Sequence, residues 1–190
     1  MQGNEMVYGE DAVLAALGRG RPTSDSGLIL GRGIAVIRDR WDRIQQSVEF
    51  ENLITEYGDQ VIMERYADIG VPDDEPQGMR LGSGGATAVA KTGAGAAIVT
   101  YISGSHAAHD SGPTSTKPAN ARVITFSSVW AAGTATNGAI NEWVVTNENP
   151  LTDVAGVAGN TISRAVTGSA LDKKATDSLT ITWTHSFEGS

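Results

Sequence analysis

The 190-residue chain contains no cysteine, so disulfide cross-links, thiolate metal sites and cysteine nucleophiles are excluded. It has only three histidines. No run of about 20 apolar residues occurs, so we expect no transmembrane helix. Residues 1–7 lack the basic stretch and apolar segment of a signal peptide, and we expect none.

The charge is acidic and unevenly distributed, with a formal net charge of −8. Residues 1–80 carry 8 basic against 15 acidic side chains, and residues 81–190 carry 6 against 7. A nucleic-acid partner requires a basic face, so this balance argues against one. It favours solubility, or docking on a basic protein surface.

The composition favours a β-rich domain with a core. Hydrophobic residues make up 40% of the chain, and 23 glycines suit tight turns better than long helices. The last segment alternates strictly: Leu179, Ile181, Trp183, His185 and Phe187 share one parity, and Thr or Ser fills the other. That period of two predicts a half-buried strand.

Short apolar segments separated by turn residues predict further strands. We expect them at 28–30, 34–37, 44–50, 98–103, 122–130, 140–146, 161–167 and 178–187, with a turn at 39–43 and a flexible or closely packed loop at 82–97. The predicted fold is mainly β, an antiparallel sandwich or barrel-like body with one packed helix. An α+β fold is the alternative.

Helical spacing predicts that helix at about residues 55–69. Thr55 or Asp59 is a suitable cap for its start. The sequence further divides into a β-rich body, residues 28–190, and an extended N-terminal arm, residues 1–27. The arm contains a short predicted helix whose apolar stripe is Val13, Leu14 and Leu17, which we expect to contact a partner.

Four segments superficially resemble chemical sites. Gly85–Thr92 lacks the glycine that a phosphate loop needs before its lysine, because residue 90 is alanine. His106, His109 and Asp110 supply too few donors for tetrahedral zinc, and contiguous acids at 73–75 do not follow calcium-ligand spacing. His185 has no Gly-x-Ser-x-Gly nucleophile motif to serve. We therefore expect no enzyme activity, no cofactor and no metal.

Tryptophan is the residue type best suited to contacts with other molecules. Trp183 has apolar neighbours in parity and is predicted to lie in the core. Trp41, Trp130 and Trp143 are candidates for a subunit interface. Exposed Trp130 or Trp143 would alternatively suit a glycan-binding module.

Several segments occur in an order that resembles small structural proteins of tailed-bacteriophage virions. They are Ile37-Arg-Asp-Arg-Trp41, Asn52-Leu-Ile-Thr55, Leu81-Gly-Ser-Gly84, Val123-Ile-Thr-Phe-Ser-Ser-Val-Trp130, Asn137-Gly-Ala-Ile-Asn-Glu142, Ser163-Arg-Ala-Val166 and Asp177-Ser-Leu-Thr-Ile-Thr-Trp183. The resemblance covers most of the chain after residue 27 and leaves the arm outside.

The resemblance implies a virion protein, assembled in the bacterial host cytoplasm, whose role is adhesion between subunits. A capsid decoration or cement protein is the leading expectation. Its partners would be the major capsid protein or other virion proteins and further copies of itself, with a trimer favoured. A tail, neck or fibre-base component is the alternative. Neither reading implies nucleic-acid or membrane binding.

Overall fold

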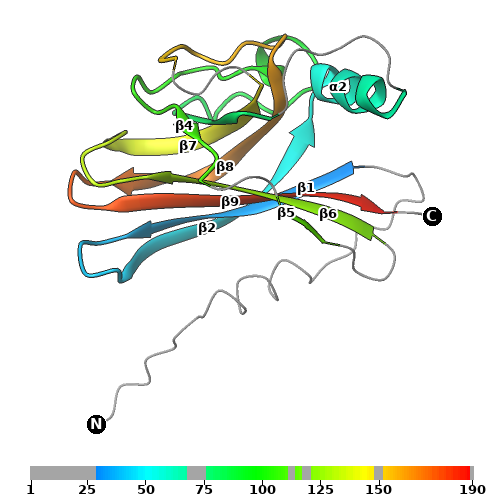
Figure 1. Cartoon of the computed structure of the whole chain (residues 1–190). Coiled ribbons are helices and arrows are strands. Elements are labelled where there is room, and N and C mark those ends of the chain that lie inside the picture. Colours follow the sequence, from blue (N-terminus) through cyan, green and yellow to red (C-terminus); the bar gives the residue numbers. More distant parts are fainter. Residues whose placement is uncertain (1–28, 68–75, 111–113, 117–120, 148–151, 189–190) are drawn as a thin grey trace.

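A computed structural model describes residues 29–67, 76–110, 114–116, 121–147 and 152–188 (Figure 1). Over these residues the fold is mainly β, with one α-helix and a single curled antiparallel sheet of nine strands. The strands are β1 (Ile29–Arg38), β2 (Ile44–Ile54), β3 (Gly78–Gly82), β4 (Ala107–Ala108), β5 (Thr114–Thr116), β6 (Ala121–Trp130), β7 (Asn137–Thr146), β8 (Thr161–Lys173) and β9 (Ser178–Glu188). The mainly β prediction is confirmed. The predicted arm, residues 1–27, lies outside the described residues.

The sheet order is β4-β3-β7-β8-β2-β1-β9-β6-β5, and curling brings its two ends together as a half-barrel. Beyond β4, the amide of Asp110 donates to the carbonyl of Ser127 on β6 at 2.7 Å. The indole Nε1 of Trp130 donates to the carbonyl of Ser105 at 2.6 Å. These two bonds join chain segments at opposite sides of the sheet order.

β1 is one continuous strand where the sequence predicted two segments split by glycines. Gly31 and Gly33 lie within it, opposite Asn52 and Phe50 of β2. A Cβ on Gly33 would lie 2.2 Å from Cζ of Phe50, so the missing side chain makes room for the aromatic ring. Both glycines are packing positions inside the strand, which is why the prediction of a break was wrong.

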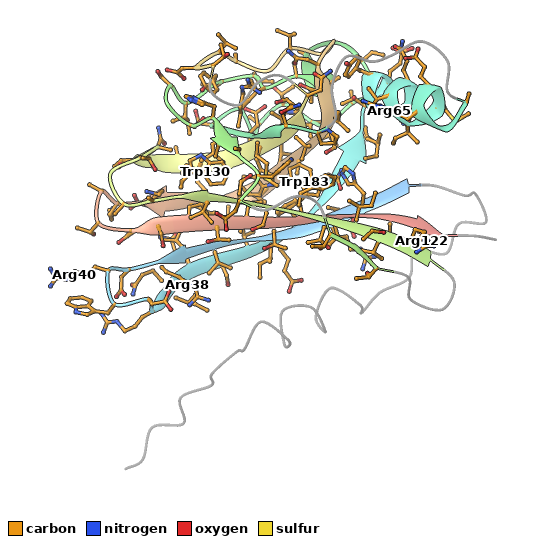
Figure 2. All side chains as sticks on the ribbon, in the orientation of Figure 1. Arg38, Arg40, Arg65, Arg122, Trp130 and Trp183 are labelled. Carbon is orange, nitrogen blue, oxygen red and sulfur yellow. The ribbon has the colours of Figure 1, made fainter. Side chains whose placement is uncertain are left out.

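The alternation of β9 gives the concave core as predicted. Leu179, Ile181 and Trp183 are fully buried, and Thr180 and Thr182 on the other face are half-buried. The ring of Phe50 packs edge-on against Trp183 and Trp143, with centroids 5.0 and 4.9 Å apart. The prediction that Trp183 lies in the core is confirmed, and Figure 2 shows it between the layers of the fold.

The helix, α2 (Glu56–Ala67), packs on β8 and β2. The Thr55 hydroxyl accepts from the Gly58 amide at 3.0 Å, so Thr55 caps the start as predicted. The predicted end at residue 69 lies outside the described residues. Ile54, which fits the helical spacing, belongs instead to β2. None of the helices formed by the described residues is long and apolar enough to cross a membrane.

Residues 83–100 form a packed cover over β7 and β8, with one 3-10 turn, η1 (Gly93–Ala96). The strand predicted at 98–103 is wrong, because Tyr101 makes only an isolated bridge to Gly82. β3, a strand that was not predicted from the sequence, takes the place beside β7. Its five residues are all buried and hence show no alternation.

Candidate functional site

The four tryptophans occupy two different environments. Trp130 and Trp143 are 2% and 0% exposed and belong to the core with Trp183. Their assignment to a subunit interface or a glycan surface was therefore wrong. The curl of the sheet turns both side chains inward, which residue spacing alone does not reveal. Trp41, by contrast, is 60% exposed.

Trp41 lies in the turn between β1 and β2, and we call residues 38–44 the Trp41 tip. The guanidinium carbons of Arg40 and Arg43 lie 3.9 and 4.7 Å from the Trp41 ring centroid. Ile44 adds a second exposed apolar side chain, at 44%. Figure 2 shows Arg38 and Arg40 at this end of the sheet, far from Arg122 at the other end.

Asp39 holds the tip in one conformation. Its carboxylate accepts from the amides of Trp41 and Arg43 at 2.9 and 3.0 Å, and from Nε of Arg43 at 2.8 Å. Gln45 Nε2 donates to the same carboxylate at 3.0 Å. The hydrogen bond from the Arg43 side chain is the main reason why the pKa of Asp39 lies below its ordinary value. Asp39 therefore stays ionised and keeps this network intact through the neutral range.

The backbone of the tip is also specialised. Asp42 has a φ of 63°, in the left-handed region that aspartate tolerates better than most residues. Its amide donates to the Asp39 carbonyl at 2.9 Å, and its own carbonyl accepts from Nη1 of Arg38 at 3.0 Å. The turn thus presents Trp41 on a preorganised scaffold, and binding through it would lose little conformational entropy.

The tip has an unusual charge for this chain. Arg38, Arg40 and Arg43 outnumber Asp39 and Asp42, so the tip is locally basic on a protein whose net charge is −8. Tryptophan and arginine are also the residues most enriched at interface hot spots. In the sequence, the signal for the whole tip is the alternation of acidic and basic residues around one tryptophan, from Arg38 to Arg43.

A buried ion pair supports the opposite side of the fold. Arg164 of β8 and Glu142 of β7 are both fully buried, with Nη2 of Arg164 at 2.8 Å from Oε1 of Glu142. Arg164 also donates to carbonyls of the covering segment at Gly84, Thr87, Ala88 and Gly95. Glu142 accepts from the amides of Gly84, Val99 and Thr100 at 3.0, 2.7 and 3.3 Å. These two charges therefore hold the backbone of the covering segment in place.

Lys173 is another fully buried charge, at the far end of β8. Its ammonium donates to the carbonyls of Ala131 and Thr134 at 3.0 and 2.8 Å, which fixes the loop between β6 and β7. Burial lowers its pKa. At the surface, Lys91 of the rejected phosphate-loop motif pairs with Asp59 of α2.

Asp153 is the common hydrogen-bond acceptor in one cluster of polar groups at the surface. It accepts from the Tyr101 hydroxyl at 2.6 Å, the Ser103 hydroxyl at 2.9 Å and the Gly104 amide at 2.7 Å, and these bonds lower its pKa to about 2. Burial, followed by the bond to Asp153, raises the pKa of Tyr101 to about 12. His106 Nδ1 lies 3.6 Å from the same carboxylate. Because Ser103 donates directly to Asp153, the cluster lacks the serine–histidine contact that activates a nucleophile.

The other two histidines lie on either side of Phe126, at centroid distances of 5.1 and 5.3 Å. His109 contacts Ser128 at 3.3 Å, and buried His185 contacts Ser163 at 3.2 Å. Burial lowers the pKa of each to about 4, and the proximity of His109 contributes to the value for His185. His185 thus lies in a buried, hydrogen-bonded structural environment. Within the described ranges, no group of three or more His, Cys, Asp or Glu side chains is placed to hold a metal ion.

The remaining candidate residues, Val13, Leu14 and Leu17, lie outside the described residues. Comparison with protein-family models finds no matching family. Searches of curated proteins and of solved structures find no match either. The Trp41 tip and the internal contacts of the fold are therefore the features that bear on function.

Proposed function

We propose that this protein is a structural component of a tailed-bacteriophage virion, a capsid decoration protein that adheres to neighbouring subunits through the Trp41 tip. The sequence resemblance motivates the virion assignment. The observation that carries the adhesive role is the 60% exposed Trp41, stacked with two arginines on a turn fixed by Asp39. A large side chain held rigidly in solvent gives a partner much apolar area at little entropic cost.

The internal contacts support an adhesive role over a chemical one. The buried charges Glu142, Arg164 and Lys173 all bind backbone groups of the fold. Three tryptophans fill the concave side of the sheet. Such a body suits a scaffold that keeps its surface features at fixed positions.

The segments that carry the resemblance also have structural roles that suit this proposal. Ile37–Trp41 leads into the tip, and Thr55 caps α2. Gly84, Glu142 and Arg164, from three separate segments, form one buried network. The segments that carry the resemblance therefore include residues that hold this fold together, as expected if proteins with this pattern have the same fold.

The test is a photo-cross-linking experiment on purified particles of the virus that encodes the chain. A photoreactive residue replaces Trp41 in one sample and exposed Val157 in the control. We expect cross-links to a second virion protein or to another copy from position 41, and few from position 157. A protein absent from the particles, or equal cross-linking at both positions, would refute the proposal.

Copy number distinguishes the two positions in the particle. Hundreds of copies, in a fixed ratio to the major capsid protein, support decoration. A dozen or fewer support the alternative, a tail, neck or fibre-base component.

A further inference from the structure

We infer that the Trp41 tip binds the acidic, apolar segment Glu10–Leu17 of a second copy of this chain. The inference rests on the proposed function, because it takes the tip as a protein-docking surface. It goes further by naming the partner and by joining two features that are far apart in the sequence.

The chemistry of the two segments is complementary. The tip offers exposed Trp41 and Ile44 beside Arg40. The segment has Glu10 and Asp11, followed by Val13, Leu14 and Leu17 at helical spacing. An apolar stripe laid on Trp41 and Ile44 would bring the two acids near the arginine side chains.

Arginine and tryptophan side chains also bind nucleic acids. Charge favours the acidic protein segment over a nucleic acid as the partner of the tip. The first 80 residues, which include the tip, carry 15 acidic side chains against 8 basic ones. Within the tip, a polyanion would also meet the carboxylates of Asp39 and Asp42, which lie beside the arginines. A short segment with two acids does not bring enough like charge to be repelled.

Distance favours a second copy over the same chain. The tip lies at the opposite end of β1 from Ile29, where the segment joins the sheet. The ten residues of β1 rise about 3.3 Å each, so the two ends of the strand are roughly 30 Å apart. To dock on the tip of its own chain, the segment would have to span that distance from Ile29. The 12 residues from Leu17 to Ile29 reach at most about 40 Å when fully extended. Self-docking would need the connection to be extended to about three-quarters of its full length along the sheet, whereas another copy meets no such constraint.

Binding from copy to copy is a head-to-tail contact, because the two surfaces differ. Repetition of such a contact closes a ring where the rotation permits, and otherwise extends as a filament. The ring is the geometry compatible with the trimer expected from the sequence.

The test uses the full-length chain in sedimentation velocity experiments at up to ~100 μM, where a weak interface is populated. Wild type should associate, and Trp41→Ala should weaken association by about 30-fold or more, the loss typical of a hot spot. Val157→Ala, a change at another exposed apolar side chain, should leave association unchanged. A wild-type chain that remains monomeric would overturn the inference.

Charge exchange identifies both the partner segment and the copy that supplies it. Arg40→Glu alone and Glu10→Lys/Asp11→Lys alone should each associate poorly, whereas an equal mixture of the two should recover association. A wild-type chain that stays monomeric, with weak acrylamide quenching of Trp41 that does not depend on concentration, would show self-docking and overturn the second-copy assignment. Unchanged association in both variants would show that this contact is absent.

Acrylamide quenching provides an independent readout, because Trp41 is exposed and Trp130, Trp143 and Trp183 are buried. Quenching should fall as wild type is concentrated, and should not fall for Glu10→Lys/Asp11→Lys. A self-association failure combined with cross-links from position 41 to a different virion protein would leave the proposed function standing. Association through the tip by a protein that is absent from the particles would support this inference and refute the proposed function.

Discussion

Replacing Glu142 by alanine should destabilise the fold strongly, because Glu142 is the acceptor that makes a buried arginine tolerable. The substitution leaves the Arg164 guanidinium fully buried without its counter-charge. It also removes the acceptor of the Gly84, Val99 and Thr100 amides. Breaking one partner of a buried ion pair costs about 3–5 kcal/mol. That is a large part of the ~5–15 kcal/mol that stabilises a typical domain.

Urea melts at neutral pH give the free energy of unfolding, with Asp59→Ala as the matched control. Asp59 pairs with Lys91 on the surface, and removal of such an exposed pair costs about 1 kcal/mol or less. Hydrogen exchange locates the effect, since the amides of Val99 and Thr100 should lose protection first. Glu142→Gln serves as a milder variant that keeps the side-chain volume.

A double-mutant cycle isolates the pair itself. Glu142→Leu combined with Arg164→Met removes both charges, so the combined loss should be smaller than the sum of the single losses by about 2 kcal/mol or more. A loss under about 1 kcal/mol for Glu142→Ala, or strict additivity in the cycle, would refute this account of residues 83–100.

Three further outcomes follow from the core, the histidines and the helix cap. Trp183→Ala should cost about 3–5 kcal/mol in denaturant melts, whereas Thr182→Ala, on the opposite face, should cost about 1 kcal/mol or less; equal small losses would contradict the core assignment. Burial holds the folded pKa values of His109 and His185 at about 4, below the ordinary 6.5, so the unfolded chain takes up protons first. Stability should therefore fall as the pH drops from about 6.5 to about 4, with His185→Gln showing a shallower dependence; equal slopes in pH-dependent melts would argue against buried neutral histidine. Thr55→Ala should cost about 1 kcal/mol or more through loss of the cap to Gly58, measured by melts against Thr55→Ser; equal stability of the two variants would contradict the cap.

Local patterns in the sequence predicted the elements whose structure depends on near neighbours. The alternation from Leu179 to Trp183 gave a strand and its buried face. Thr55 identified the start of the helix, because a cap acts within three residues. The turn at 39–43 was predicted for the same reason, since Asp39 binds groups only two to six residues away.

The errors came from contacts between distant segments. Gly33 resembles a strand break until Phe50 is known to occupy the space of its missing side chain. The inward direction of Trp130 is fixed by the curl of the sheet and by the Ser105 carbonyl, 25 residues away. The order of residues 83–100 depends on Arg164, whose guanidinium reaches a segment about 70 residues earlier. No local periodicity encodes these partners.

The position of β1 has a mechanical consequence. It is an inner strand, hydrogen-bonded to β9 on one side and β2 on the other. A pull applied at Ile29 against an anchor at the Trp41 tip would act along the length of this strand. Because a strand is already close to full extension, the backbone of β1 itself would carry such a load, and its hydrogen bonds to β2 and β9 would not have to break. The body should therefore transmit tension between these two points with little change in length and without unfolding.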